Sequence, residues 1–238
     1  MLSTKNCAHC GLQGLCIRKI PLFSSLSNDE LVKILPLIQH YAYNKGDIIL
    51  HDKEPINTLI MINQGKVKAS KYSSEGREQI IHVFNETEFF GEQFLTETQI
   101  SDYTIEALSE VHICVLSKNH FNQIVIKHPD IAMNLISELY KRMRKLESTI
   151  YHLNIRDVDT RVNALLVSYA IEHGKVTQQG IVIDLPLSRE QMANYLGIAR
   201  ETMSRKLTQL ENDSLIISIN NRKILIKNLE LLQQTLDI

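Results

Sequence analysis

The chain has 238 residues, of which 44% are hydrophobic and 22% charged, a composition that fits one large or two ordinary globular domains and excludes a disordered or fibrous chain. Its formal net charge is -1, so the charge of the whole chain does not indicate a nucleic-acid partner, and any such function must come from local charge. No apolar stretch is long enough for a signal peptide or a membrane span, so we expect a cytoplasmic protein without a membrane partner.

The first segment, residues 1–20, is a loop that holds three of the chain's four cysteines: Cys7, Cys10 and Cys16. A Cys-x2-Cys pair followed by a third cysteine can place three thiolates around one soft metal site. In a reducing cytosol, clustered cysteines are more often metal ligands or redox sensors than structural disulfides. Structural zinc and a thiol-disulfide switch are the alternatives, and unligated surface thiols are the least favoured because they oxidise.

Residues 21–128 consist of short runs of β-branched and apolar residues separated by turn signals. The runs 48–50, 59–62, 67–69, 80–84 and 105–107 alternate with turns such as Lys45-Gly46-Asp47. Many short strands at near-regular spacing predict an antiparallel barrel or roll. Cys114 lies in another such run, 111–116, where an isolated cysteine is usually a small core residue. Three thiolates leave a four-ligand site incomplete, however, so Cys114 is also a candidate fourth ligand.

Residues 129–156 predict one long helix, because glycine and proline are absent between Pro129 and Gly174 and strong helix formers dominate. Its apolar residues recur at alternating steps of three and four: Ile136, Leu139, Met143, Leu146, Ile150 and Leu153. This heptad pattern favours a parallel two-stranded coiled coil and therefore a homodimer. The alternative is a single amphipathic helix on its own core, but its apolar stripe would be wider than this one, which charged residues such as Arg142 and Arg144 flank.

Residues 157–238 carry the signals of a winged helix-turn-helix. Ser188 to Gln191 form a Ser-x-x-Gln capping box that opens a helix, Gly197 ends it, and a second helix follows from about residue 200 to 212. The runs 215–219 and 223–226 flank a turn at 220–222, which predicts the hairpin called the wing. Residues 186–227 hold seven Lys or Arg against four Asp or Glu, so this segment is locally basic.

The outward face of the second helix carries Arg200, Glu201, Ser204 and Arg205. Arginine pairs with guanine, a carboxylate accepts from the cytosine amino group, and serine serves several bases. The segment therefore predicts a helix that reads double-stranded DNA. No Ser/His/Asp or paired-carboxylate constellation stands out, so we do not expect an enzyme.

A β-roll, a long dimer helix and a winged helix in this order resemble the CRP/FNR family of bacterial transcription regulators. The resemblance implies an α+β fold with a cyclic-nucleotide-binding-like roll, a coiled-coil dimer helix and a C-terminal winged helix-turn-helix. Members that bind cyclic nucleotides carry a Phe-Gly-Glu turn and, later, an Arg-Ser pair that neutralises the phosphate. This chain has the turn at 90–92 but Asp102 and Tyr103 at the later positions, so we expect no cyclic-nucleotide effector.

The cysteines are similar to those of the FNR subgroup, the fumarate and nitrate reduction regulators, including FNR-like proteins of Gram-positive bacteria. Those proteins hold a [4Fe-4S] cluster through an N-terminal Cys-x2-Cys-x5-Cys and one cysteine on the roll, a pattern matched by Cys7, Cys10, Cys16 and Cys114. The resemblance implies that oxygen degrades the cluster, loosens the dimer and lowers specific DNA binding. The alternative is a reversible dithiol-disulfide switch without iron, as in some Gram-positive relatives.

The recognition helix resembles two branches of the family. FNR proteins read a TTGAT-type half-site through Glu-x-x-Ser-Arg, here Glu201, Ser204 and Arg205, whereas Arg200 is typical of the branch that reads TGTGA. Both half-sites contain TGA, which we assign to Glu201 and Arg205. The resemblance implies a pseudo-palindromic DNA site and RNA polymerase as a further partner.

Overall fold

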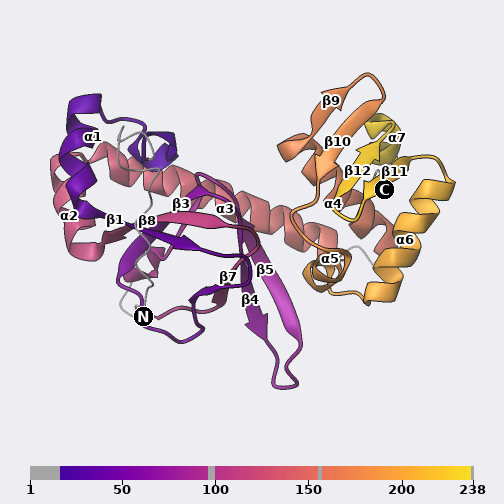
Figure 1. Ribbon diagram of the computed structural model, residues 1–238, viewed down its shortest axis with the longest axis horizontal. Coiled ribbons are helices and arrows are strands. Elements are labelled where there is room, and N and C mark those ends of the chain that lie inside the picture. Colours follow the sequence, from indigo (N-terminus) through magenta and orange to yellow (C-terminus); the bar gives the residue numbers. More distant parts are fainter. Residues whose placement is uncertain (1–16, 96–99, 155–156, 237–238) are drawn as a thin grey trace. The chain divides into compact units, whose positions relative to one another are not determined.

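The computed structural model describes residues 17–95, 100–154 and 157–236, and the chain forms two compact units, Met1–Met143 and Arg144–Ile238 (Figure 1). The predicted ligands Cys7, Cys10 and Cys16 lie outside the described residues, and the side chains of Ile150 and Leu153 are also outside the described part. None of the helices in the described part of the chain is long and apolar enough to cross a membrane.

The first unit contains two antiparallel four-stranded sheets, in the orders β1-β8-β3-β6 and β2-β7-β4-β5. Their strands are β1 (Ile38–Tyr43), β2 (Ile48–Leu50), β3 (Thr58–Gln64), β4 (Val67–Tyr72), β5 (Glu78–Phe84), β6 (Phe89–Phe90), β7 (Thr104–Ala107) and β8 (Val111–Ser117). This is the predicted roll. Every run that predicted a strand is one, and β1 and β6 are additional.

The first sheet is buried on both faces because its central strands are apolar at successive positions. In β3, Ile60 and Ile62 join the core between the two sheets, whereas Leu59 and Met61 face a second core. Successive side chains of a strand point to opposite faces, so an unbroken apolar run is what such a strand requires. Cys114, in the middle of β8, belongs to the second core.

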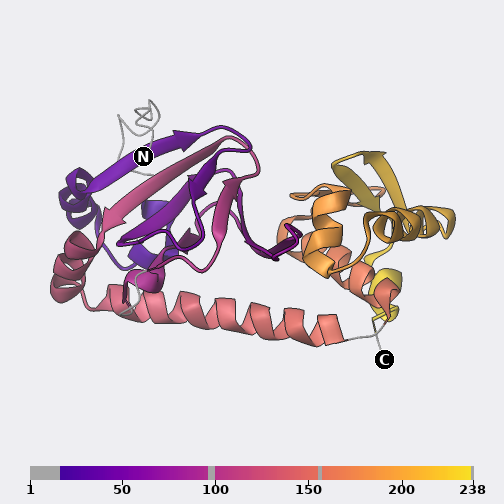
Figure 2. The ribbon, with the colours of Figure 1, turned by 90° about the horizontal axis from the view of Figure 1, so that it is seen from below.

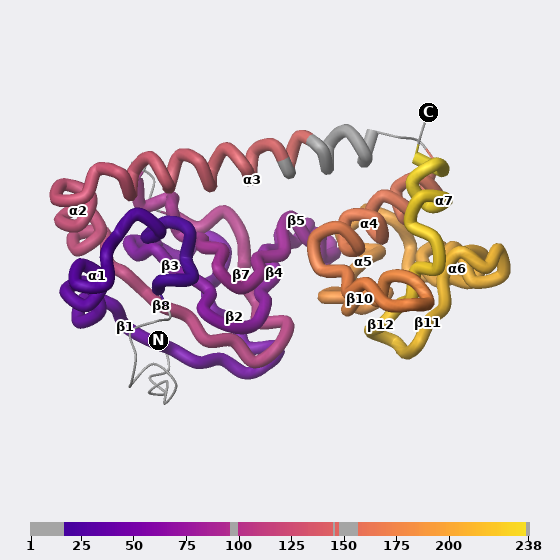
Figure 3. Tube along the Cα trace, turned by 90° about the horizontal axis from the view of Figure 1, so that it is seen from above, coloured from indigo at the N-terminus to yellow at the C-terminus, as the bar shows by residue number. Residues whose placement is uncertain are grey.

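Helices cover this second core. They are η1 (Ile17–Lys19), η2 (Pro21–Phe23), α1 (Asn28–Ile34), η3 (Leu35–Leu37), η4 (Glu92–Leu95), α2 (Lys118–Lys127) and the start of α3 (Asp130–Asn154). Helices α1 and α2 lie side by side at one end of the roll (Figure 3), where Glu30 and His128 are 3.5 Å apart. The second core therefore joins the segment that follows Cys16 to α3.

Helix α3 confirms the predicted long helix, and its first half runs along the roll (Figure 2). Ile131 and Leu135 are buried in the second core, and Leu139 packs partly against it. Along the described part of α3, five large apolar side chains are exposed to solvent: Met133, Ile136, Tyr140, Met143 and Leu146. We call these five residues the exposed stripe.

The second unit is a small α+β domain. It consists of α4 (Val158–His173), β9 (Lys175–Thr177), β10 (Gly180–Asp184), α5 (Arg189–Leu196), α6 (Arg200–Asn212), β11 (Ile216–Asn220), β12 (Lys223–Ile226) and α7 (Leu229–Gln234), with one sheet in the order β11-β12-β10-β9. Helices α5 and α6 are the predicted helix-turn-helix, and the β11–β12 hairpin is the predicted wing. The predicted α+β fold class is confirmed.

Candidate nucleic-acid interface and cysteine site

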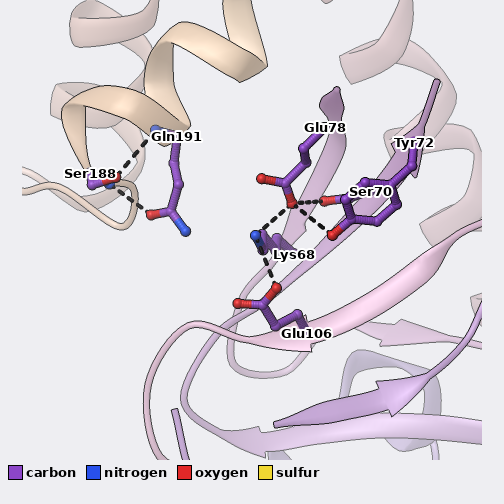
Figure 4. Close-up of polar contacts among 7 residues, drawn as sticks. All are labelled: Lys68, Ser70, Tyr72, Glu78, Glu106, Ser188 and Gln191. Carbon is purple, nitrogen blue, oxygen red and sulfur yellow. Dashed lines mark hydrogen bonds and ion pairs between the residues drawn. The ribbon is translucent and has the colours of Figure 1, made fainter. Parts of the chain in front are cut away.

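The turn between α5 and α6 has the local chemistry that its sequence predicted. The Ser188 Oγ accepts a hydrogen bond of 3.2 Å from the Gln191 amide, and the Gln191 Oε1 accepts one of 2.9 Å from the Ser188 amide (Figure 4). At the other end of α5, Gly197 has φ 63° and ψ 38°, the left-handed conformation that favours glycine. A Cβ at Gly197 would meet nothing within 4 Å, so the requirement for glycine is one of backbone conformation.

The two helices pack through apolar inward faces. Six residues on these faces are buried: Met192, Ala193, Leu196, Met203, Leu207 and Leu210. Their burial fixes the rotation of α6 and leaves Arg200, Glu201 and Arg205 exposed, with Ser204 half-buried. The helix thus presents four polar side chains on one face, and they are of types that can contact base edges.

A pocket of about 350 Å³ lies beside this face of α6. Arg200 and Ser204 of α6 line it together with Arg189 from the start of α5 and Arg222 from the wing turn. Glu190 is the one carboxylate among its lining residues. Three guanidinium groups around one hollow suit phosphate oxygens, which supply about half to two-thirds of the hydrogen bonds in protein–DNA interfaces.

Arg189 and Arg222 had not been singled out from the sequence. Arg222 is held in place, since its Nη1 donates a 2.9 Å hydrogen bond to the Pro186 carbonyl and its amide donates one of 2.8 Å to the Asn220 side chain. The one available signal was their place in elements already recognised, the capping box and the wing turn. By contrast, Lys206 of α6 pairs with Asp159 and so serves the fold of the unit.

Cys114 is fully buried in β8, opposite His40 of β1 and Met61 of β3. Its Sγ lies 3.4 Å from the Nδ1 of His40. A thiolate is the soft donor that an iron–sulfur cluster requires. Ile17, one residue after Cys16, is buried in the same core cluster as Cys114. The described residues are therefore compatible with such a group. Within them, no three His, Cys, Asp or Glu side chains gather as a metal site.

The segment after Cys16 also contacts α3. The Asn134 Nδ2 of α3 donates a 3.1 Å hydrogen bond to the Leu22 carbonyl, and Ile131 shares the buried core with Ile17. This contact was not predicted from the sequence. Residues 17–22 therefore share the buried core of Cys114 and are hydrogen-bonded to α3.

The predicted seam of α3 is divided in the structure. Ile136, Met143 and Leu146 are exposed, whereas Leu139 packs partly on the roll. Met133 and Tyr140 are the further exposed apolar residues on the described part of the helix. An apolar stripe of this length on one helix is a surface suited to a partner helix.

Two domain models match the chain and together span both units. The cyclic nucleotide-binding domain matches residues 41–128, and the Crp-like helix-turn-helix domain matches residues 160–235. The chain belongs to the CRP/FNR family of transcription regulators. It is therefore a DNA-binding transcription regulator, from a family of regulators rather than enzymes.

Relatives of this CRP/FNR regulator are similar over most of their length. It is 26% identical over 201 residues to the probable transcriptional regulator flp of Lacticaseibacillus casei, which covers 84% of this chain and 89% of that protein. It is 28% identical over 177 residues to the cAMP-activated global transcriptional regulator CRP of Pasteurella multocida, with coverage of 74% and 84%.

Solved structures of the same fold include a CooA mutant from Carboxydothermus hydrogenoformans and FixK2 from Bradyrhizobium japonicum. The CooA mutant has a TM-score of 0.78 at 22% identity and covers 100% of this CRP/FNR regulator and 98% of its own chain. FixK2 has a TM-score of 0.74 at 23% identity, with coverage of 84% and 98%. At these identities the likeness establishes the fold alone.

Proposed function

We propose that the chain is a homodimeric, oxygen- or redox-responsive regulator that binds a pseudo-palindromic DNA site. The observation that carries the DNA-binding part is the exposed face of α6 beside a hollow with three arginines. Glu201 and Arg205 read the TGA of each half-site, Arg200 reads an outer base, and Ser204 assists. Arg189 and Arg222 hold the phosphate backbone.

The exposed stripe of α3 carries the dimer. Pairing of two α3 helices through Ile136, Met143 and Leu146 buries apolar side chains that the single chain leaves in water. The coiled coil would continue through Ile150 and Leu153, and Leu139 borders it. Two α6 helices related by the dimer axis would enter successive major grooves about 34 Å apart. RNA polymerase is the further partner that a regulator bound in this way would contact.

The sensing site consists of Cys7, Cys10, Cys16 and Cys114, which would hold a [4Fe-4S] cluster. When bound, the cluster supplies oxygen sensitivity. The support for this site is that Ile17 shares the buried core of Cys114 and that Leu22 is hydrogen-bonded to α3, so a change at Cys16 would be passed to α3 through residues 17–22. Neighbouring His40 would donate a hydrogen bond to the sulfur of Cys114 and orient it. A cyclic nucleotide is not the effector, since exposed Asp102 would repel its phosphate.

Anaerobic purification of the full chain tests the sensing site. We expect a brown protein with iron and acid-labile sulfide in equal amounts, and loss of both in Cys114→Ser. The matched control is Ser109→Ala, a half-buried position just before β8 and outside the cysteine site. A colourless protein whose DNA affinity follows thiol oxidants and reductants would replace the cluster with the disulfide switch. A colourless protein whose DNA affinity responds to neither iron nor thiol reagents would overturn both.

Titration of labelled DNA tests the DNA-binding part. The expected result is tight binding to a duplex with two TGA half-sites and weak binding to a scrambled duplex of the same composition. Equal affinity for the two duplexes at physiological salt would contradict the assignment of base-reading residues.

A further inference from the structure

Arg142 differs from the basic residues that flank it on α3. The side chains of Lys141 and Arg144 are each 67% exposed and pair with Glu138 and Glu147 on their own helix. The Arg142 side chain is 17% exposed and reaches away from the helix to the roll. The sequence predicted only that Arg142 flanks the seam, and the structure adds that its side chain is turned onto the roll.

The guanidinium of Arg142 has four contacts in the roll. Its Nη1 donates a 2.5 Å hydrogen bond to the Oε1 of Glu92, and its Nη2 donates one of 2.6 Å to the Phe89 carbonyl. Its Cζ lies 5.0 Å from the ring centroid of Phe84 and 5.1 Å from that of Phe89. A planar cation between two aromatic rings, with a carboxylate at one end, is a guanidinium site.

The roll holds its side of this contact rigidly. Glu92 follows Gly91, whose φ is 93° and whose missing Cβ would lie 2.4 Å from the Thr58 carbonyl, so neither the conformation nor the space admits a side chain there. The Oε2 of Glu92 is buried and has no hydrogen-bond partner among the described residues. Without Arg142, this carboxylate would be a largely buried and uncompensated charge.

Arg142 carries the contact between α3 and the roll further along the helix than its buried start. Ile131, Asn134 and Leu135 fix the start of α3, and Arg142 follows Leu135 by two helical turns. Its neighbour Met143 belongs to the exposed stripe. The position of Arg142 therefore determines how the middle of the helix lies on the roll and where the stripe faces.

We propose that Arg142 is an internal ligand of the roll, a guanidinium on α3 that binds the Phe90-Gly91-Glu92 turn between Phe84 and Phe89 and so positions α3 for dimerisation. The dimer role of α3 is taken from the proposed function above. The site itself depends only on contacts within the first unit.

The experiment compares full-length Arg142→Ala with Lys141→Ala and Arg144→Ala, which each delete one charge from an exposed neighbour. Analytical ultracentrifugation under anaerobic conditions measures the dimer dissociation constant. We expect an increase of about tenfold or more in Arg142→Ala, because Glu92 loses its partner, and of less than about twofold in the two controls.

Chemical rescue separates a guanidinium site from a general loss of packing. Guanidinium chloride far below denaturing concentrations should restore the dimer of Arg142→Ala, whereas sodium chloride at equal ionic strength should not. Rescue should disappear in Arg142→Ala combined with Glu92→Gln. Arg142→Lys should recover only part of the affinity, since an ammonium group lacks the planar fork.

Each outcome has one meaning. If the wild type and Arg142→Ala dimerise equally well, the inference is overturned and the proposed dimer stands. A wild type that is monomeric at all concentrations overturns the dimer, and the guanidinium site is then judged by rescue of the melting temperature. If Arg142→Ala does not fold, Arg142→Lys decides: dimerisation equal to the wild type rejects the site, and weakened dimerisation with a wild-type melting temperature supports it.

Discussion

Arg205 and Arg222 are both basic residues of the DNA-binding unit, but their positions lead us to expect different contacts with DNA. Arg205 is exposed on α6, where we propose that it reads base edges, whereas Arg222 is hydrogen-bonded to the Pro186 carbonyl beside the arginine-lined hollow. We expect Arg205→Ala to cost about 1–3 kcal/mol on the specific site and to relax selectivity at one base pair. Fluorescence anisotropy on matched and single-mismatch duplexes measures both quantities.

Arg222→Ala serves as the comparison. It should weaken binding to the specific and to the scrambled duplex to a similar degree. It should also lower the slope of log affinity against log salt by about 1. If Arg205→Ala kept the wild-type ratio of specific to scrambled binding, its base-reading role would be wrong. If Arg222→Ala changed that ratio, the arginine would be reading bases instead of phosphates.

Residues differ in how far the sequence could predict them. The face of α6 was predictable because helical spacing alone separates Met203 and Leu207 from Arg200 and Arg205. Arg189 and Arg222 converge only after α5, α6 and the wing have packed, and no local pattern records that. The contacts of Arg142 were still harder to predict. The heptad pattern places Arg142 beside the seam, and only its ion pair with Glu92 of the roll reveals that the side chain turns inward.

Among the elements, the hairpin of β4 and β5 carries a buried cation. The Lys68 Nζ lies 2.5 Å from Glu78 and 3.1 Å from Glu106, and its side chain is 6% exposed (Figure 4). Burial opposes the charge of Lys68, but the hydrogen bonds to Glu78 and Glu106 outweigh it and raise the pKa of Lys68. Lys68→Ala would leave two carboxylates without their shared cation, at a cost of about 3–5 kcal/mol. Urea unfolding measures this, with exposed Lys71→Ala on the same strand as the control.

Helix α4 begins at a cap whose effect depends on pH. The Asp157 carboxylate accepts hydrogen bonds from the Thr160 hydroxyl at 2.7 Å and the Thr160 amide at 3.0 Å, and these lower the pKa of Asp157. A carboxyl with a lowered pKa stabilises the fold above its unfolded pKa, and that contribution is lost as the pH falls through the folded value. Asp157→Ala should therefore cost about 1 kcal/mol at neutral pH, and less in acid.

Asp157→Asn is the matched variant, because asparagine also caps helices but does not titrate. It should keep most of the stability at pH 7 and remove this part of the acid dependence. Thermal unfolding followed at neutral and acidic pH distinguishes the two variants. An acid dependence identical in wild type and Asp157→Asn would show that the cap does not contribute to it.

Two neighbouring strands of the roll, β8 and β1, illustrate which elements could be predicted from the sequence. Strand β8 was visible as the apolar run 111–116, because a strand buried on both faces must be apolar throughout. Strand β1 was not, since its buried residues alternate with Gln39 and His40 and it follows a short helix directly. The ion pairs of Lys68 were also hidden, because Glu106 is brought to it by strand pairing across a long loop.

At the scale of the whole molecule, the near-zero net charge conceals an uneven distribution of charge along the chain. Residues 186–227 are locally basic, while the formal charge of the chain is -1. DNA affinity should therefore depend on salt through a few arginines. The logarithm of the affinity should fall with the logarithm of the salt concentration, with a slope of about 0.9 for each phosphate contacted, although the chain as a whole carries no net positive charge that would attract DNA. Fold class and DNA binding were accessible from the sequence for this reason: both follow from local patterns.

Alkaline stability is a property that both units share, because each contains a tyrosine whose hydroxyl is kept neutral. Burial is the main cause that raises the pKa of Tyr43 and of Tyr103 to about 12 each, and burial also raises the pKa of Tyr169. A folded pKa above the unfolded value of 10.0 means that stability is complete below pH 10 and is lost as the pH rises toward 12. As far as these tyrosines are concerned, the urea midpoint should therefore be flat from neutral pH to pH 10 and fall above it.

The assignment of this loss to particular side chains is testable in the roll. Tyr103 accepts a 2.8 Å hydrogen bond from Gln93, next to Glu92, whose charge further opposes ionisation of the phenol. Tyr103→Phe removes a titrating group without removing the ring, so its stability should fall less between pH 10 and 12 than that of the wild type. Exposed Tyr72→Phe is the weaker comparison, because its pKa is raised at a site open to solvent. If both variants followed the wild-type curve, the loss above pH 10 would have to come from other groups, Lys68 foremost, because its raised pKa means that its contribution is lost as the pH rises above its ordinary value of 10.5.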